Sequence, residues 1–306
     1  MRISTNMVYQ SGINQINDLT SEQNKLQLQI GSMKKILTPS DDPVAAASAV
    51  QVEQAQSLNT QYTSNRSTVN SQLTNVSSTL SSVSNLIVSI QSTIVTAGNG
   101  SYSNSDRATL ATTINNQLAQ MLGYANTADA SGNYIFAGNQ NTTAPYQQTS
   151  TGATYSGDSG QNTVQVATQR YMQVNYTGSQ VFSANGNDVF TTLTNLAKLL
   201  NTPVTDQASQ TALTNGIAAA NASMSSALNN VSSIQASVGA NLNEIATLNT
   251  NGTSTSTQNA ATLSGLQDLD YAQAVSDLSK NTTILNAAMK SYTTVTSLSL
   301  FDILKG

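Results

Sequence analysis

Two long stretches of the chain carry apolar residues at alternating intervals of four and three positions, the repeat of one face of an α-helix that packs against a partner. The first stretch covers residues 69–94 and the second covers residues 213–238, after which the spacing steps by four to Leu242 and Ile245. The positions in between are almost all Ser, Thr, Asn or Gln. The sequence therefore predicts two long helices, whose apolar positions are Val69, Leu73, Val76, Leu80, Val83, Ile87, Ile90 and Ile94 in the first, and Leu213, Ile217, Ala220, Met224, Ala227, Val231, Ile234 and Val238 in the second.

Both ends of the chain carry a weaker form of the same repeat, because each contains a polar residue at an apolar position. A polar helix with a narrow apolar face is marginal in isolation, so each end has to bury this face. Periodicity alone favours an intramolecular antiparallel pair, and the alternative is that the two ends become ordered only in an assembly. The repeat comprises Ile16, Leu19, Gln23, Leu26, Ile30, Met33 and Leu37 at one end, and Tyr271, Val275, Leu278, Thr282, Leu285, Met289 and Tyr292 at the other.

Proline, glycine and aspartate mark where the predicted helices begin and end. In the segment Pro39, Ser40, Asp41, Asp42 and Pro43, the second proline suits a first helical position and Asp42 suits the N-cap before it. The segment 97–100, Ala-Gly-Asn-Gly, has the composition of a helix C-terminus. Residues 251–257 read as a polar turn between the last two helices. Shorter helices are expected over residues 106–130 and from residue 189.

The middle of the chain has a different composition, rich in Gly, Thr, Tyr and Gln from residue 134 to about residue 187. Apolar and polar residues alternate in segments 164–166 and 172–176, as in half-buried strands. We therefore predict a mainly α protein with a small β insert, an elongated rod of long antiparallel helices from both chain ends. The expected domains are terminal coiled-coil arms at 1–42 and 265–306, a helical rod at 43–133 and 187–264, and a β-rich insert at 134–186.

Composition excludes most enzyme chemistry. The chain has no Cys, His or Trp, which removes Cys/His zinc sites, thiol nucleophiles and Ser-His-Asp triads. Only 8% of the residues are charged and the net charge is −4, so no nucleic-acid partner is expected. No apolar run approaches the length of a membrane-spanning helix, and residues 1–10 lack the features of a secretory signal. Asp41 with Asp42, and Asp268 with Asp270, are better explained as helix caps than as catalytic or calcium-binding pairs. We expect no catalytic, metal or cofactor site.

Several blocks of sequence resemble the flagellin superfamily, and within it the proteins of the hook–filament junction. Residues 39–46, Pro-Ser-Asp-Asp-Pro-Val-Ala-Ala, are similar to that family's helix-break motif. Residues 132–138, Gly-Asn-Tyr-Ile-Phe-Ala-Gly, match a second family block. The opening Met-Arg-Ile-Ser-Thr and residues 299–304, Ser-Leu-Phe-Asp-Ile-Leu, resemble the junction proteins more than the flagellins. The resemblance covers roughly residues 1–138 and 187–306 and is weaker in the insert.

The resemblance implies a structural adaptor of the flagellum that joins the hook to the flagellin filament. Its implied partners are hook-associated protein 1, flagellin, copies of itself within one axial layer, and an export chaperone. It also implies export through the flagellar type III channel, an extracellular location, and terminal helices that form the inner tube of the axial structure and are disordered in the free monomer. The expected assembly interface comprises Ile16, Leu19, Leu26, Ile30, Met33, Val275, Leu278, Leu285, Met289, Tyr292, Leu300 and Phe301.

Other functions remain possible at this point. A flagellin that forms the filament itself would share the helical ends, although the first and last residues of the chain argue against it. A secreted coiled-coil adhesin or effector would lack the paired repeats at the two ends. An enzyme would need a carboxylate cluster, and the sequence offers none to test first.

Overall fold

A computed structural model of the chain describes residues 5–183 and 186–304, and these residues fold as two compact units. The central unit consists of residues 59–253, and the end unit combines residues 1–58 with residues 254–306. Two long helices, α2 (Pro43–Ala97) and α6 (Gln207–Gln267), contribute to both units. Each unit is described by itself below.

In the central unit, α2 and α6 run antiparallel. Gln91 of α2 donates a hydrogen bond to Ser225 of α6 at 3.0 Å, whereas Arg66, earlier in α2, bonds Asn249, later in α6, at 2.7 Å. The apolar repeat of residues 69–94 is buried throughout, and most of the repeat of residues 213–245 is buried against it. The two predicted long helices and their packing faces are therefore confirmed.

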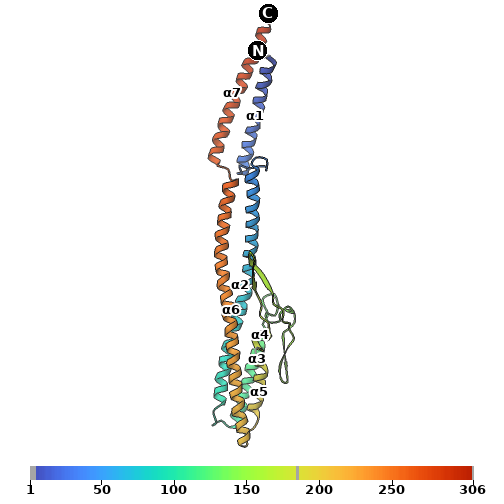
Figure 1. Ribbon diagram of the computed structural model, residues 1–306, viewed down its shortest axis with the longest axis vertical. Coiled ribbons are helices and arrows are strands. Elements are labelled where there is room, and N and C mark those ends of the chain that lie inside the picture. The colour runs from blue at the N-terminus through green and yellow to red at the C-terminus, as the bar shows by residue number, and fades with distance from the viewer. Residues whose placement is uncertain (1–4, 184–185, 305–306) are drawn as a thin grey trace. The chain divides into compact units, whose positions relative to one another are not determined.

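Two shorter helices complete this core, α3 (Asn104–Ala125) and α5 (Val189–Asn201), which lie side by side (Figure 1). Ser103 and Asp106 form a capping box at the start of α3, and Asp188 caps α5. One apolar face of each helix is buried, as the amphipathic spacing of both segments requires. Both predicted shorter helices are present, but α3 ends at Ala125 and not at residue 130.

Helix α2 contains a stretch long and apolar enough, by composition, to span a membrane, with a mean hydropathy of 1.3. The sequence expectation concerned an uninterrupted apolar run, whereas this stretch meets a criterion of mean hydropathy with polar residues interspersed. Its apolar residues, including Val83, Ile87 and Ile94, are completely buried in the core of the central unit. The hydropathy of α2 thus has an explanation in packing between helices.

The β insert consists of two separate antiparallel hairpins, which lie beside the helices of the central unit (Figure 1). One joins β1 (Tyr146–Thr149) to β2 (Gly152–Tyr155), and the other joins β3 (Thr163–Ala167) to β4 (Arg170–Gln173). A five-residue helix follows, α4 (Gly178–Phe182). Apolar alternation predicted the second hairpin, although β4 ends before residues 174–176; the first hairpin, rich in Gln and Thr, and α4 gave no comparable signal. The insert is attached to the helices by an aromatic cluster of Phe136, Tyr146, Phe182 and Phe190.

In the end unit, α1 (Thr5–Ser32) and α7 (Tyr271–Leu304) lie side by side and antiparallel (Figure 1). Gln23 bonds Thr282 at 3.3 Å, and the rings of Tyr9 and Tyr292 meet edge to face with centroids 6.4 Å apart. Among the described residues, the buried apolar side chains of this unit are Ala45, Ala49, Ala274 and Leu285. The extensive core of the protein therefore lies in the central unit.

The predicted turn at residues 251–257 was wrong, because α6 continues without interruption to Gln267. Gly252 is buried against Arg66 and Asn59, so the missing side chain makes room for close packing and does not end the helix. Thr253 donates its hydroxyl to the carbonyl of Asn249 within the same helix. The break comes instead at residues 268–270, where Asp270 accepts the Gln273 amide at 3.1 Å and caps α7, as expected for this aspartate.

Candidate assembly surface

The segment between α1 and α2 is held by the two aspartates of its motif. Asp41 accepts the backbone amides of Leu37 and Thr38 at 3.0 and 2.9 Å and the Lys25 ammonium at 2.8 Å. The hydrogen bond from Lys25 is the largest cause, and the backbone amides add to it, in holding the pKa of the Asp41 carboxyl far below its ordinary value. Asp42 accepts the Ala45 amide at 2.9 Å and caps α2, confirming its expected role.

The same segment is joined to the connection between α6 and α7. The Lys35 amide donates to the Gln267 carbonyl at 2.8 Å, and the Leu269 amide donates to the Met33 carbonyl at 3.0 Å. Met33 itself adopts a left-handed backbone conformation, with φ of 58°, directly after the last residue of α1. Pro39, Ser40 and Pro43 complete the turn, with Ser40 sharing a hydrogen bond with Thr38 at 2.8 Å. Both helix breaks of the end unit therefore form one hydrogen-bonded joint.

The residues of the expected assembly interface fall into two groups. Seven are partly or fully buried, and they contribute to the packing of the end unit; Leu285 is the most buried of them, at 8% exposed. Met33, Val275 and Met289 are exposed. The side chains of Leu300 and Phe301 lie outside the described residues. The seven are Ile16, Leu19, Leu26, Ile30, Leu278, Leu285 and Tyr292.

On α7, the more buried face differs from the predicted repeat at two positions. Ala274 and Asn281 are buried, at 4% and 8% exposed, whereas the neighbouring Val275 is 41% exposed. The buried and partly buried positions 274, 278, 281 and 285 are spaced by four, three and four residues, so they keep the alternation of the predicted repeat. Sequence reasoning missed these two positions because an alanine and an asparagine do not stand out in a chain rich in both. The buried face of α7 is consequently less apolar than predicted.

Because the buried face of α7 differs from the predicted repeat, three apolar side chains of that repeat remain exposed. They are Tyr271, Val275 and Met289, and they are called here the outer strip. All three side chains are more than 40% exposed. Residues 271 and 289 are separated by 18 positions, or five turns of helix at 3.6 residues per turn, and residue 275 lies one turn from residue 271. The three side chains therefore share one face of α7.

Among the described residues, no group of three His, Cys, Asp or Glu side chains lies close enough to hold a metal ion. Several carboxylates have structural roles. Asp106 accepts the hydroxyl and the backbone amide of Ser103, Asp206 accepts the backbone amide of Ser209, and Glu244 pairs with Arg170. The hydrogen bonds from these partners lower the pKa values of all three carboxyls. Surfaces between helices are the features with functional potential.

Comparison with known proteins defines the class first. The bacterial flagellin N-terminal helical region matches residues 3–141, and the bacterial flagellin C-terminal helical region matches residues 222–302. The fold is also that of a putative flagellar hook-associated protein from Vibrio parahaemolyticus, with a TM-score of 0.68 and 21% identity over 74% of this chain and 100% of that chain. A flagellar hook-associated protein-3 from Legionella pneumophila has a TM-score of 0.66 and 22% identity to this chain, over 71% of this chain and 98% of that chain. The chain is built on the flagellin plan.

Two curated relatives narrow this class. Flagellar hook-associated protein 3 of Escherichia coli strain K12 is 34% identical over the full length of both chains. The protein of the same name from Salmonella typhimurium is 33% identical over 99% of each chain. The chain therefore belongs to the flagellar hook-associated protein 3 family, flagellin-like structural proteins of the hook–filament junction, and is a component of the bacterial flagellum.

Proposed function

We propose that this protein is the adaptor layer between hook and filament, built from copies of itself that contact hook-associated protein 1 below and flagellin above. Its terminal arms, residues 1–42 and 265–306, pack with the arms of neighbouring copies in the inner tube of the axial structure. The protein reaches this site unfolded through the flagellar type III channel, delivered by an export chaperone. The function is mechanical and requires no catalysis.

The observation that carries this proposal is the uneven distribution of the core. Every large buried apolar side chain among the described residues lies in the central unit except Leu285. Complete burial of one such side chain contributes about 1.5–3 kcal/mol, whereas ordering the backbone of a single residue costs about 1–2 kcal/mol. The pair α1–α7 alone thus lacks the burial that keeps long polar helices ordered, and neighbouring copies supply it.

The outer strip supports the same proposal from the opposite direction. Tyr271, Val275 and Met289 are exposed in the single chain, yet they share one face of α7. A face of this kind on a marginal helix is a surface for another helix, since association removes it from water. We assign Leu285 and the partly buried Leu26 and Leu278 to pairing of the arms, and the outer strip with Met33 to contacts between copies.

The rod, residues 43–133 and 187–264, and the insert, residues 134–186, form the part of the molecule that we propose is stable in the free protein.

Limited proteolysis of the free protein is expected to remove the arms first. A protease of broad specificity at low ratio will cleave within residues 1–40 and 265–306 and leave a resistant middle, because those segments bury little apolar surface. Mass spectrometry of the products gives the boundaries. First cleavage in the insert, with both ends intact, would show that the arms are ordered before assembly and contradict this part of the proposal.

A further inference from the structure

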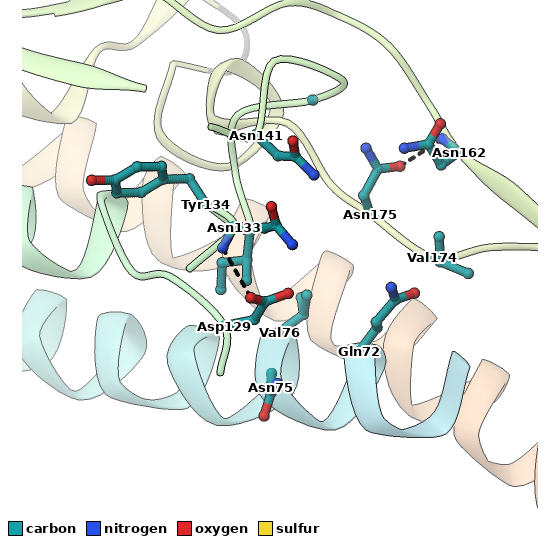
Figure 2. Close-up of a pocket in the computed structure, with 12 residues that line it drawn as sticks. Gln72, Asn75, Val76, Asp129, Asn133, Tyr134, Asn141, Asn162, Val174 and Asn175 are labelled. Atoms are coloured by element: carbon teal, nitrogen blue, oxygen red, sulfur yellow. Dashed lines mark hydrogen bonds between the residues drawn. The ribbon is translucent and has the colours of Figure 1, made fainter. Parts of the chain in front are cut away.

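A polar cavity of about 110 Å³ lies in the central unit, between α2 and the loops of the insert (Figure 2). Gln72, Asn75 and Val76 reach it from α2, and residues 129–141 line a second side. The third side comes from the two ends of the β3–β4 hairpin, with Asn162 before β3 and Asn175 after β4. Three parts of the chain far apart in sequence thus converge on one small space that the assembly function does not use.

Primary amides are concentrated around this cavity. Asn and Gln make up about a fifth of the chain, yet they provide six of the twelve lining residues. Among the hydrogen bonds of the described residues, none uses the side-chain amides of Gln72, Asn75, Asn141 or Asn162; Asn141 is partly buried and the other three are exposed to solvent. Figure 2 shows Asn141 and Gln72 on opposite sides of the space, with their amides directed into it. Each amide offers two donor hydrogens and an acceptor oxygen.

The walls of the cavity are fixed by hydrogen bonds of other residues. Asp129 accepts the backbone amides of Ser131 and Asn133 through Oδ1, at 2.8 and 2.9 Å. The amide of Asn133 is the largest cause that lowers the pKa of this carboxyl, so Asp129 is charged. The side chain of Asn175 accepts the backbone amide of Asn162 at 2.7 Å and donates to the Gly160 carbonyl at 3.0 Å. These bonds fix the loops on two sides of the cavity, and helix α2 forms the remaining side.

The chemistry of the lining selects the class of ligand. No Lys or Arg is among the lining residues, and the one charged side chain is a carboxylate, so phosphates and other anions are disfavoured. Ca²⁺ takes about six to eight oxygen ligands, often from several carboxylates, so a site with one carboxylate is poorly suited to it. Ordinary small-molecule pockets hold roughly 300–1,000 Å³, so the ligand here is much smaller than a nucleotide or a lipid. Val76 and Val174 add apolar surface beside the amides.

We propose that this cavity binds a neutral sugar, one hexose ring presented edge-on. Adjacent hydroxyls of a sugar each donate one hydrogen bond and accept two, and an amide or carboxylate offers matching neighbouring groups. Asp129 accepts from one hydroxyl, and the side-chain amides of Gln72 and Asn141, which are directed into the space from opposite sides, bond other hydroxyls of the ring. This binding activity is separate from the proposed junction function and stands or falls independently of it.

Saturation-transfer difference NMR on the purified full chain tests the site, with D-glucose, D-galactose and D-mannose, each at millimolar concentration, as the probes. At least one hexose is expected to show saturation transfer to its ring protons. Asn141→Ala and Gln72→Ala each remove one ligand group, and each is expected to weaken that binding about tenfold. Asn70→Ala, at an exposed position on the same helix α2, is the matched control and is expected to leave the signal unchanged.

Three results would overturn the sugar site: no saturation transfer from any of the three hexoses, a signal that persists in both cavity variants, or loss of the signal in the Asn70→Ala control. Titration with calcium chloride alone is the remaining comparison. If calcium shifts the protein's own NMR signals and no sugar shows saturation transfer, the proposed ligand is wrong and the site binds a cation. Two cavity variants on different elements are used so that misfolding of the loop that carries Asn141 does not decide the result.

Discussion

Replacement of Leu285 by aspartate is expected to abolish incorporation of the protein into the flagellum while leaving its central unit folded. Leu285 is the largest buried apolar side chain of the described end unit, at 8% exposed. The substitution removes its burial, worth about 1.5–3 kcal/mol, and forces a carboxylate either to lose water or to separate the helices. Strains in which this variant replaces the natural protein should be non-motile, as seen in swimming assays and in electron micrographs of cells without filaments.

Two further variants identify the step that fails. Met289→Asp changes an exposed residue of the outer strip, so it should leave the single chain unchanged yet also block incorporation. Ser276→Asp places the same charge on an exposed part of α7 away from the Leu285 face and near the helix N-terminus, where a negative charge is favourable. Cells with Ser276→Asp should swim normally. Normal filaments on cells with Leu285→Asp would show that these side chains are not the assembly surface.

The second large effect is expected at Arg66, which is 2% exposed in the central unit. Its guanidinium donates to Asn249 of α6 at 2.7 Å, to the Val166 carbonyl of β3 at 2.9 Å and to Thr63 at 2.8 Å. Burial without a nearby carboxylate lowers the pKa of this group, and only neutral oxygens compensate it. One side chain thus joins α2, α6 and the β3–β4 hairpin.

Arg66→Ala leaves the buried Val166 carbonyl without this donor, removes the bonds to Asn249 and Thr63, and opens a cavity, so the free energy of unfolding should fall by about 3 kcal/mol. For a unit of this size, the midpoint of thermal unfolding then falls by about 6–12 °C, measurable by circular dichroism. Arg170→Ala is the matched control, because Arg170 connects the same hairpin to Glu244 of α6 through an exposed ion pair. Such pairs contribute little to the free energy of unfolding. Equal midpoints for the two variants would contradict the role of Arg66.

The parts of this structure that were predictable from the sequence are those where apolar residues alone determine the packing. Val69 to Ile94 and Leu213 to Val238 form faces of Leu, Ile, Val and Met against a background of hydroxyl and amide side chains, so their periodicity indicated both long helices. The caps at Asp42 and Asp270 were predictable because a cap depends on local geometry.

The parts that were missed depend on small or polar residues in tertiary contacts. Gly252 suggested a turn, but its missing side chain accommodates Arg66, and no local pattern reveals such a long-range neighbour. Val275 was assigned to the packed face of α7, but Ala274 and Asn281 occupy that face, since close approach of two helices favours small side chains there. The lining of the amide cavity comes from three separate segments and has no signature in any one of them.

The most direct test of the junction role is deletion of the gene in the source bacterium, followed by electron microscopy of the cell surface and analysis of protein in the medium. An adaptor that provides the seat for the filament predicts bare hooks together with full-length flagellin shed into the medium. Bare hooks without flagellin in the medium would mean that this chain is the filament protein itself. Normal filaments on the deletion strain would contradict any role for it in joining filament to hook.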